Sequence, residues 1–119
     1  AFAWNHSVSL GHIAAVNAIE VLLDKPDPDL CPTCGRDKGP GPTRLFREFV
    51  ERYATGTTAD ERNGIYRLRS SLVHGSRLLD IDLPRAWGAL TPTQWEQSDT
   101  YATARAAARS ALINWLLDR

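Results

Sequence analysis

A helix predicted over residues 59–74 is the feature that most constrains how this chain can fold. Thr58 and Glu61 stand at the positions of a capping box. The Thr58 hydroxyl would accept a hydrogen bond from the Glu61 N–H, and the Glu61 carboxylate one from the Thr58 N–H. Gly75 follows the last turn, where a left-handed glycine commonly ends a helix. Both ends of this helix are therefore specified locally, and the rest of the fold must be arranged around it.

One face of this helix is apolar and the opposite face is polar. Ile65, Leu68 and Leu72 recur at helical spacing and form an apolar stripe. At ~100° per residue, a polar group falls on the opposite face: Asn63, Arg67, Ser70 and His74. Arg69 lies nearer the stripe, ~140° from His74. The two side chains could bind one ligand together only if the helix end unwinds at His74, or if the long arginine side chain wraps around the helix. A second helix that contributes its own copies would also bring such groups together. Otherwise His74 complements the helix dipole and the arginines lie along a solvated surface.

Three further helices are predicted from the spacing of apolar residues, and no repeat or strand-rich segment interrupts them. We therefore expect an all-α fold, an up-down four-helix bundle. Residues 76–97 form a long connection before the last helix, partly extended, with Trp87 and Trp95 sealing the core. The predicted helices run from Ser7 or Ser9 to about Asp24, from Arg44 to about Ala54 after a Thr43 cap, and from a Ser98 or Asp99 cap to about Leu117. Thr91-Pro92-Thr93-Gln94 is a further helix-start signal, which we expect to open a single turn before the last helix.

The Pro- and Gly-rich connection over residues 25–42 carries a second recognisable chemistry. Its Cys-Pro-Thr-Cys-Gly run has the form of one zinc knuckle, since two thiolates in a tight turn suit tetrahedral zinc. Cys31 and Cys34 supply only half of such a structural zinc site. His6, His12, a second copy or a further part of the protein would have to complete it. A redox dithiol fits less well because no βαβ unit precedes the motif, and an inert turn with two free thiols remains the other interpretation.

Composition limits the remaining choices. The 119 residues suit a single domain, and 14 basic residues balance 14 acidic ones, so no global field attracts nucleic acid. No stretch approaches the ~20 apolar residues of a membrane span, and no secretory signal is present. Two cysteines in one CxxC do not suggest a secreted disulfide scaffold, so we expect a cytoplasmic protein. Because the chain begins with Ala1, we expect it to be part of a longer protein.

The central segment Ile-Tyr-Arg-Leu-Arg-Ser-Ser-Leu-Val-His-Gly resembles the Arg-x4–6-His signature of the HEPN superfamily, most closely the ApeA-like domains associated with bacterial defence. Arg69 and His74 match the two motif positions. The Asn-Ala-Ile-Glu-Val-Leu-Leu run at residues 17–23 is similar to the first helix of such domains, and the resemblance covers residues 8–118. Ser70 stands where many active members have another polar residue, often Asn.

The resemblance implies a metal-independent endoribonuclease that needs no cofactor for catalysis. His74 would move protons, because the ordinary pKa of histidine lies near neutrality, and Arg69 would hold the scissile phosphate. Arg67, Ser70 and Asn63 would add contacts to phosphate or to RNA. Glu20, in an otherwise apolar turn of the first helix, is either an exposed or arginine-paired carboxylate or a residue that orients Arg67 or Arg69.

The same resemblance implies partners. Two motif helices would pack across a two-fold axis into a composite site, so we expect a homodimer through the central and last helices. It implies a toxin or antiviral defence effector acting on RNA, regulated by an antitoxin or another domain. Two alternatives stay open: a non-catalytic HEPN-like module for dimerisation or RNA binding, favoured by Ser70 and the neutral charge, and a zinc-knuckle helical adaptor that uses Cys31 and Cys34 to meet a protein.

Overall fold

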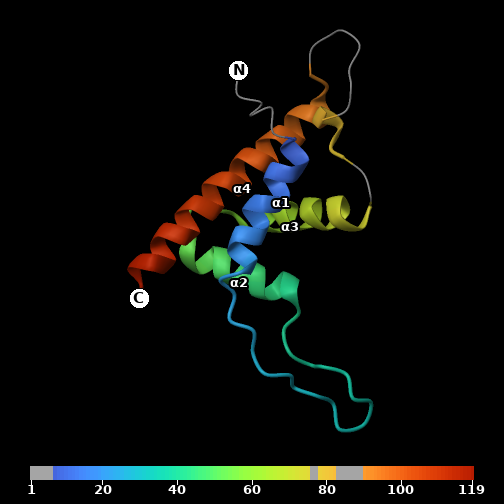
Figure 1. Cartoon of the computed structure of the whole chain (residues 1–119), viewed down its shortest axis with the longest axis vertical. Coiled ribbons are helices and arrows are strands. Elements are labelled where there is room, and N and C mark those ends of the chain that lie inside the picture. The colour runs from blue at the N-terminus through green and yellow to red at the C-terminus, as the bar shows by residue number, and fades with distance from the viewer. Residues whose placement is uncertain (1–6, 76–77, 83–89) are drawn as a thin grey trace.

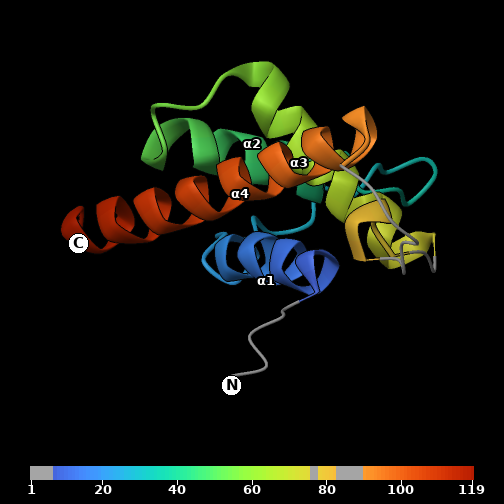
Figure 2. The same cartoon turned by 90° about the horizontal axis from the view of Figure 1, so that it is seen from above.

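A computed structural model describes residues 7–75, 78–82 and 90–119, and these form an all-α four-helix bundle, as predicted. Figure 1 shows α1 and α4 side by side, with α2 and α3 crossing them, and Figure 2 shows the same arrangement from above. The only extended pairing in the described part is an isolated bridge between Leu30 and Asp37. The elements are α1 Val8–Glu20, α2 Pro42–Tyr53, α3 Ala59–His74, the 3₁₀ turn η1 Asp80–Asp82, and α4 Pro92–Leu117.

The predicted bounds of α3 are confirmed. Its capping box is present: Glu61 N–H donates to the Thr58 hydroxyl at 3.2 Å, and Thr58 N–H donates to the Glu61 carboxylate at 2.8 Å. Gly75, however, has φ −84°, so the prediction of a left-handed glycine is wrong. The glycine is required for another reason, because a Cβ at this position would collide with the carbonyl oxygen of Ser71.

Several other predicted bounds were wrong. The last helix begins at Pro92 instead of after Ser98 or Asp99. Thr91 and Gln94 form a second capping box there, and the helix continues without a break. The single turn predicted at Thr91 is thus the first turn of α4, and the segment around Leu79 and Ile81 that was predicted to be extended contains the 3₁₀ turn η1. The second helix begins at Pro42 after Gly41, and the first ends at Glu20, short of Asp24.

The core forms where all four helices meet, and α4 contacts each of the other three. Small buried alanines let α4 approach the other helices closely, and the rings of Phe46 and Tyr66 pack with centroids 5.0 Å apart. Trp95 is 56% exposed, so its predicted role in sealing the core is wrong, and Trp87 lies outside the described residues. No helix in the described part is both long and apolar enough to cross a bilayer. The core residues are Val16, Ile19, Phe46, Val50, Ala54, Ile65, Tyr66, Ala104, Ala107, Ala108 and Ala111.

A buried histidine joins α1 to α3. His12 is fully inaccessible to solvent, and its Nε2 lies 2.9 Å from the carbonyl oxygen of Ile65. The neutral ring therefore donates to that carbonyl, while Nδ1 has no partner among the described residues. Burial lowers the pKa of His12, and its bond to Ile65 only partly opposes this.

This lowered pKa predicts acid sensitivity. Below pH 6.5, the ordinary pKa of histidine, the unfolded chain binds a proton that folded His12 resists, so the free energy of unfolding should fall as the pH drops. His12→Gln, whose amide can still donate to Ile65, should flatten this slope between pH 6.5 and 5. Urea unfolding across that range measures it. An unchanged slope in His12→Gln would show that another group is responsible.

A carboxylate from η1 anchors the start of α1. Asp82 accepts hydrogen bonds from Val8 N–H and Ser9 N–H, both at 2.7 Å, and from the hydroxyls of Ser7 and Ser9 at 2.9 and 2.5 Å. The Ser9 hydroxyl also accepts from Leu79 N–H at 2.8 Å. Burial raises the pKa of Asp82, but the bonds from Ser9, Val8 and Ser7 together outweigh it and lower the pKa. The connection before α4 is thereby fastened to α1.

Replacing Asp82 with asparagine should lower the free energy of unfolding by about 1–2 kcal/mol, because an amide NH₂ would face donors at the helix start. In the parent, this stabilisation should be present above the ordinary aspartate pKa of 3.8 and disappear as the pH falls through the lowered value. Thermal unfolding at pH 7 and pH 3 measures both effects. Asp27→Asn, in the exposed loop, is the control and should change neither. A difference between Asp82→Asn and the parent that persists undiminished at the lowest pH would contradict the charge-based explanation.

Candidate functional site

Arg69 is held in place by α1 and by its own helix. Its Nη2 lies 3.0 Å from Oε2 of Glu20, and both side chains are only about one-fifth exposed, at 21% and 22%. Tyr66, one turn earlier on α3, donates its hydroxyl to the other Glu20 oxygen at 3.2 Å, and its ring centroid lies 5.9 Å from the guanidinium carbon of Arg69. Glu20 therefore binds and orients Arg69, and not Arg67, whose side chain is exposed.

Burial and charge in this triad act on Tyr66 and leave Arg69 with free donors. Burial first, and then the negative charge of Glu20, raise the pKa of Tyr66, so this hydroxyl remains a hydrogen-bond donor at neutral pH. Arg69 Nε is buried and meets no acceptor among the described residues. One nitrogen of the guanidinium is thus engaged by Glu20, and the planar group keeps further N–H donors with which it can bind an anion.

Tyr66 was not among the residues predicted from the sequence to belong to a site. The sequence spacing could have indicated it, because Tyr66 lies three residues before Arg69 and residues at this spacing are neighbours on a helix surface. What the sequence did not contain was the position of Glu20, which depends on how α1 packs against α3.

The other predicted residues of α3 lie apart from this triad. His74 is exposed in the last turn, and no hydrogen bond or ion pair with a described residue holds it. Ser70 is half-buried. Asn63 accepts a hydrogen bond from Arg47 Nη1 of α2 at 3.0 Å. In one chain, therefore, the structure joins Arg69 to Glu20 and Tyr66, while none of the residues that it describes forms a hydrogen bond or ion pair with His74.

The groove between α3 and the start of α4 does not favour RNA. It has a volume of ≈ 820 Å³ and contains Arg67 and Trp95. Its charged lining is mostly acidic, however, so it would repel phosphate groups. The carboxylates are those of Asp60, Glu61, Glu96 and Asp99. A phosphate site on this protein must therefore lie outside this groove, as Arg69 does.

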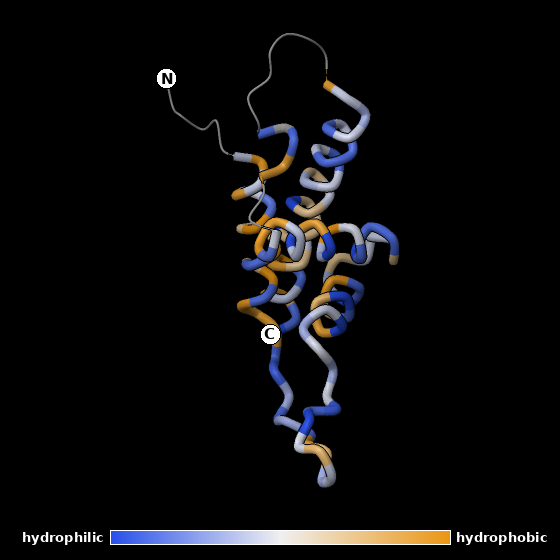
Figure 3. Tube along the Cα trace, turned by 90° about the vertical axis from the view of Figure 1, so that its right-hand side faces the viewer, coloured by the Kyte–Doolittle hydropathy of each residue, from blue (hydrophilic) through white to orange (hydrophobic). Residues whose placement is uncertain are grey.

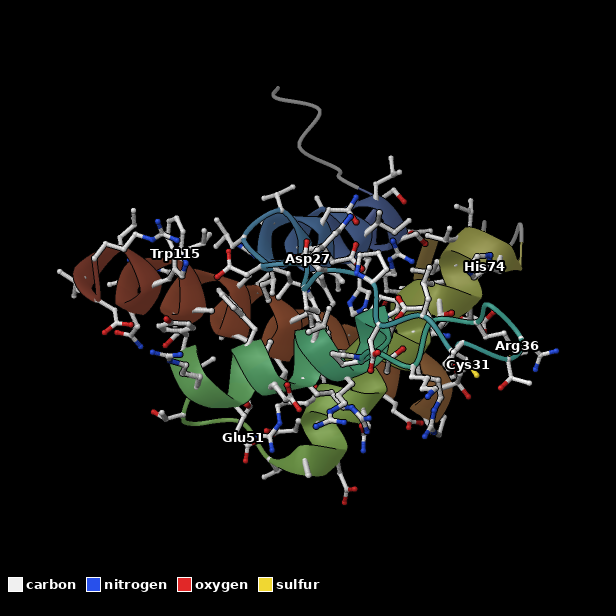
Figure 4. The ribbon with its side chains drawn as sticks, turned by 90° about the horizontal axis from the view of Figure 1, so that it is seen from below. Asp27, Cys31, Arg36, Glu51, His74 and Trp115 are labelled. Atoms are coloured by element: carbon white, nitrogen blue, oxygen red, sulfur yellow. The ribbon has the colours of Figure 1, made fainter. Side chains whose placement is uncertain are left out.

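The CxxC segment folds into a defined turn. Gly35 has φ +70° and donates its N–H to the Cys31 carbonyl at 2.9 Å, while Cys31 N–H donates to the Arg36 carbonyl at 2.7 Å. The backbone N–H of Cys34, and then that of Thr33, donate to the Cys31 sulfur and lower the pKa of its thiol. Figure 4 places Cys31 and Arg36 on the loop between α1 and α2, and His74 at the end of α3.

His12 was one of several candidates to complete the zinc site, and it is not available because its ring is buried and bonded to Ile65. His6 lies outside the described residues. Within residues 7–75, 78–82 and 90–119, no group of three or more His, Cys, Asp or Glu side chains is arranged to hold a metal ion. Cys31 and Cys34 therefore have no further ligand in the described part of their own chain.

Comparisons with known proteins add no relative. No protein-family model, no curated protein and no solved structure matches the chain. The function of this chain must therefore be inferred from the residues and geometry of α1, α3 and the CxxC loop.

Proposed function

We propose that this chain is a metal-independent endoribonuclease of the HEPN type, acting on single-stranded RNA at a site composed from two copies. The observation that carries the proposal is the fixed position of Arg69, bound by Glu20 at 3.0 Å on the same helix as the exposed His74. An arginine held between a carboxylate and a tyrosine ring is preorganised, so little conformational freedom is lost when it binds phosphate.

The chemistry requires few protein groups. The 2′-oxygen of the substrate attacks the adjacent phosphorus, and the bond from phosphorus to the 5′-oxygen breaks. A base removes the 2′-hydroxyl proton, and an acid delivers a proton to the departing 5′-oxygen. His74 of one copy would serve as the base and His74 of the other as the acid, while Arg69 stabilises the charge on the non-bridging oxygens. The products would be a 2′,3′-cyclic phosphate and a 5′-hydroxyl.

A second copy resolves the separation of the two motif residues. Arg69 and His74 lie ~140° apart on an ideal helix, so one helix does not present both to one phosphate. Two α3 helices related by a two-fold axis would present both kinds of group from opposite sides. Val73, beside His74, and Trp95 at the start of α4 are large apolar residues, 45% and 56% exposed, that such an interface would bury.

The test compares an RNA oligonucleotide with the same sequence in DNA, each incubated with the chain in excess chelator. RNA should be cut and DNA should not, because DNA lacks the attacking 2′-hydroxyl. Mass spectrometry of the fragments should show cyclic phosphate and 5′-hydroxyl ends. Cleavage of both substrates, or 5′-phosphate ends, would contradict the proposed mechanism.

A second candidate is a non-catalytic module that dimerises or binds RNA. The ion pair favours it, because the Glu20 carboxylate offsets the charge of Arg69, and the chain as a whole has no net charge. RNA binding without cleavage by a dimeric chain would identify this function. In either case we propose a cytoplasmic protein whose activity is controlled by an antitoxin or by another domain, in keeping with a role in defence.

A further inference from the structure

We propose that two copies of this chain bind one Zn²⁺ between them, each supplying Cys31 and Cys34. This site is separate from Arg69 and His74, and it does not depend on whether the chain cleaves RNA. Four thiolates around one ion form the tetrahedral set that structural zinc prefers, with Zn–S distances of about 2.3 Å.

The turn is already folded for this task. The left-handed backbone of Gly35, at φ +70°, reverses the chain after Cys34. The hydrogen bond from Gly35 N–H to the Cys31 carbonyl closes the turn at 2.9 Å. The backbone amides of Thr33 and Cys34 point at the Cys31 sulfur, and the Cys34 thiol is also within hydrogen-bonding reach of it. The two sulfurs therefore lie together, and metal binding does not have to reorganise the chain around them.

The segments on both sides of the turn hold it in place. The Leu30–Asp37 bridge pairs the segments on its two sides, and Lys38 N–H donates to the Asp29 carbonyl at 2.7 Å. Asp37 Oδ1 accepts from Asp29 N–H at 3.0 Å and from Gly39 N–H at 2.8 Å. These bonds fix the backbone around the two thiols, as the hydrogen bonds outside a metal's first ligands do when they orient those ligands.

The chain itself does not complete the site in its described part. No third potential ligand joins Cys31 and Cys34 there. Cys34 is exposed, and Cys31 is only partly covered. A zinc ion held by these two residues alone would keep two positions open to water, and a structural site is normally closed by four protein ligands.

The position of the loop favours a second copy of the chain as the source of the other two zinc ligands. In Figure 1 the connection between α1 and α2 extends away from the bundle, so two such loops can meet tip to tip without a clash between helices. Figure 3 shows hydrophobic residues at the far end of this loop, and Leu30, next to Cys31, is 59% exposed. Pairing two tips would cover Leu30 of each copy.

The test uses the whole chain, reduced with a phosphine and freed of metal, titrated with Zn²⁺ and separately with Co²⁺. We expect saturation at one metal per two chains. The cobalt complex should show the intense thiolate charge-transfer and visible bands of a tetrahedral four-sulfur site. Sedimentation at a concentration where the chelated protein is monomeric should show a dimer once zinc is added.

Variants make the result specific. Cys31→Ser and Cys34→Ser should each lose the bands and the zinc-dependent dimer, whereas Thr33→Ser, in the same turn, should keep both. Circular dichroism confirms that each variant folds. Saturation at one metal per chain, a cobalt spectrum with fewer than four sulfurs, or no binding at micromolar metal would each overturn the proposal.

Discussion

Replacing His74 with alanine is expected to lower the rate of RNA cleavage by about 10²–10⁴-fold, the range associated with loss of a general acid or base. Because the side chain is exposed and has no partner among the described residues, the fold should not change. Single-turnover cleavage of a labelled RNA, with thermal unfolding measured in parallel, separates the two effects.

Ser71→Ala is the matched control for this change. Ser71 is exposed on the same last turn of α3, and among the described residues its hydroxyl donates only to the carbonyl of Leu68 within the helix, at 2.9 Å. Its cleavage rate should stay within a few-fold of the parent rate. If His74→Ala cleaved as fast as Ser71→Ala, His74 would have no part in proton transfer.

Replacing Arg69 with alanine should cost about 10²–10³-fold in cleavage rate, the usual loss when one preorganised donor to a transition-state anion is removed. Here the fold should also suffer. Glu20 and Tyr66 would lose their shared partner, and a half-buried carboxylate would be left with a single hydrogen bond. We expect the free energy of unfolding to fall by about 1 kcal/mol, since the pair is still partly screened by solvent.

Two companion variants separate charge from geometry. Arg69→Lys keeps the positive charge but not the planar fork, so it should recover most of the stability and little of the activity. Arg67→Ala removes an exposed arginine from the same helix, but Arg67 lies in the mostly acidic groove that does not favour phosphate, so neither RNA binding nor the maximal rate should change by more than about two-fold. Equal losses in Arg67→Ala and Arg69→Ala would mean that Arg69 contributes only general positive charge.

Local signals predicted the fold well where they were unambiguous. Thr58 and Glu61 form their capping box because both partners lie within one turn. The sequence contains two possible N-caps for α4, one at Thr91 and one at Ser98 or Asp99. A local pattern does not say at which of them the helix begins. The helix begins at the first and continues through the second, because nothing between them breaks it.

The site was less predictable because it depends on packing between helices. Glu20 was expected to meet either Arg67 or Arg69, and only the crossing of α1 over α3 decides for Arg69. Gly75 was correctly expected at the end of α3. Glycine is needed there because a Cβ would collide with the Ser71 carbonyl, and not because the backbone is left-handed. Trp95 was assigned to the core from its size alone, yet α4 turns it outward.

The most direct test of the composite site is the cleavage rate per chain, measured in EDTA over a range of protein concentration beside sedimentation of the same samples. We predict cleavage without metal, with a rate per chain that rises in proportion to the fraction of dimer. EDTA also removes zinc, so dimerisation through the CxxC loop would not contribute. A rate per chain that is independent of concentration across the monomer–dimer transition would contradict a composite site. A folded dimer that binds RNA but does not cut it would contradict the nuclease and identify a binding module.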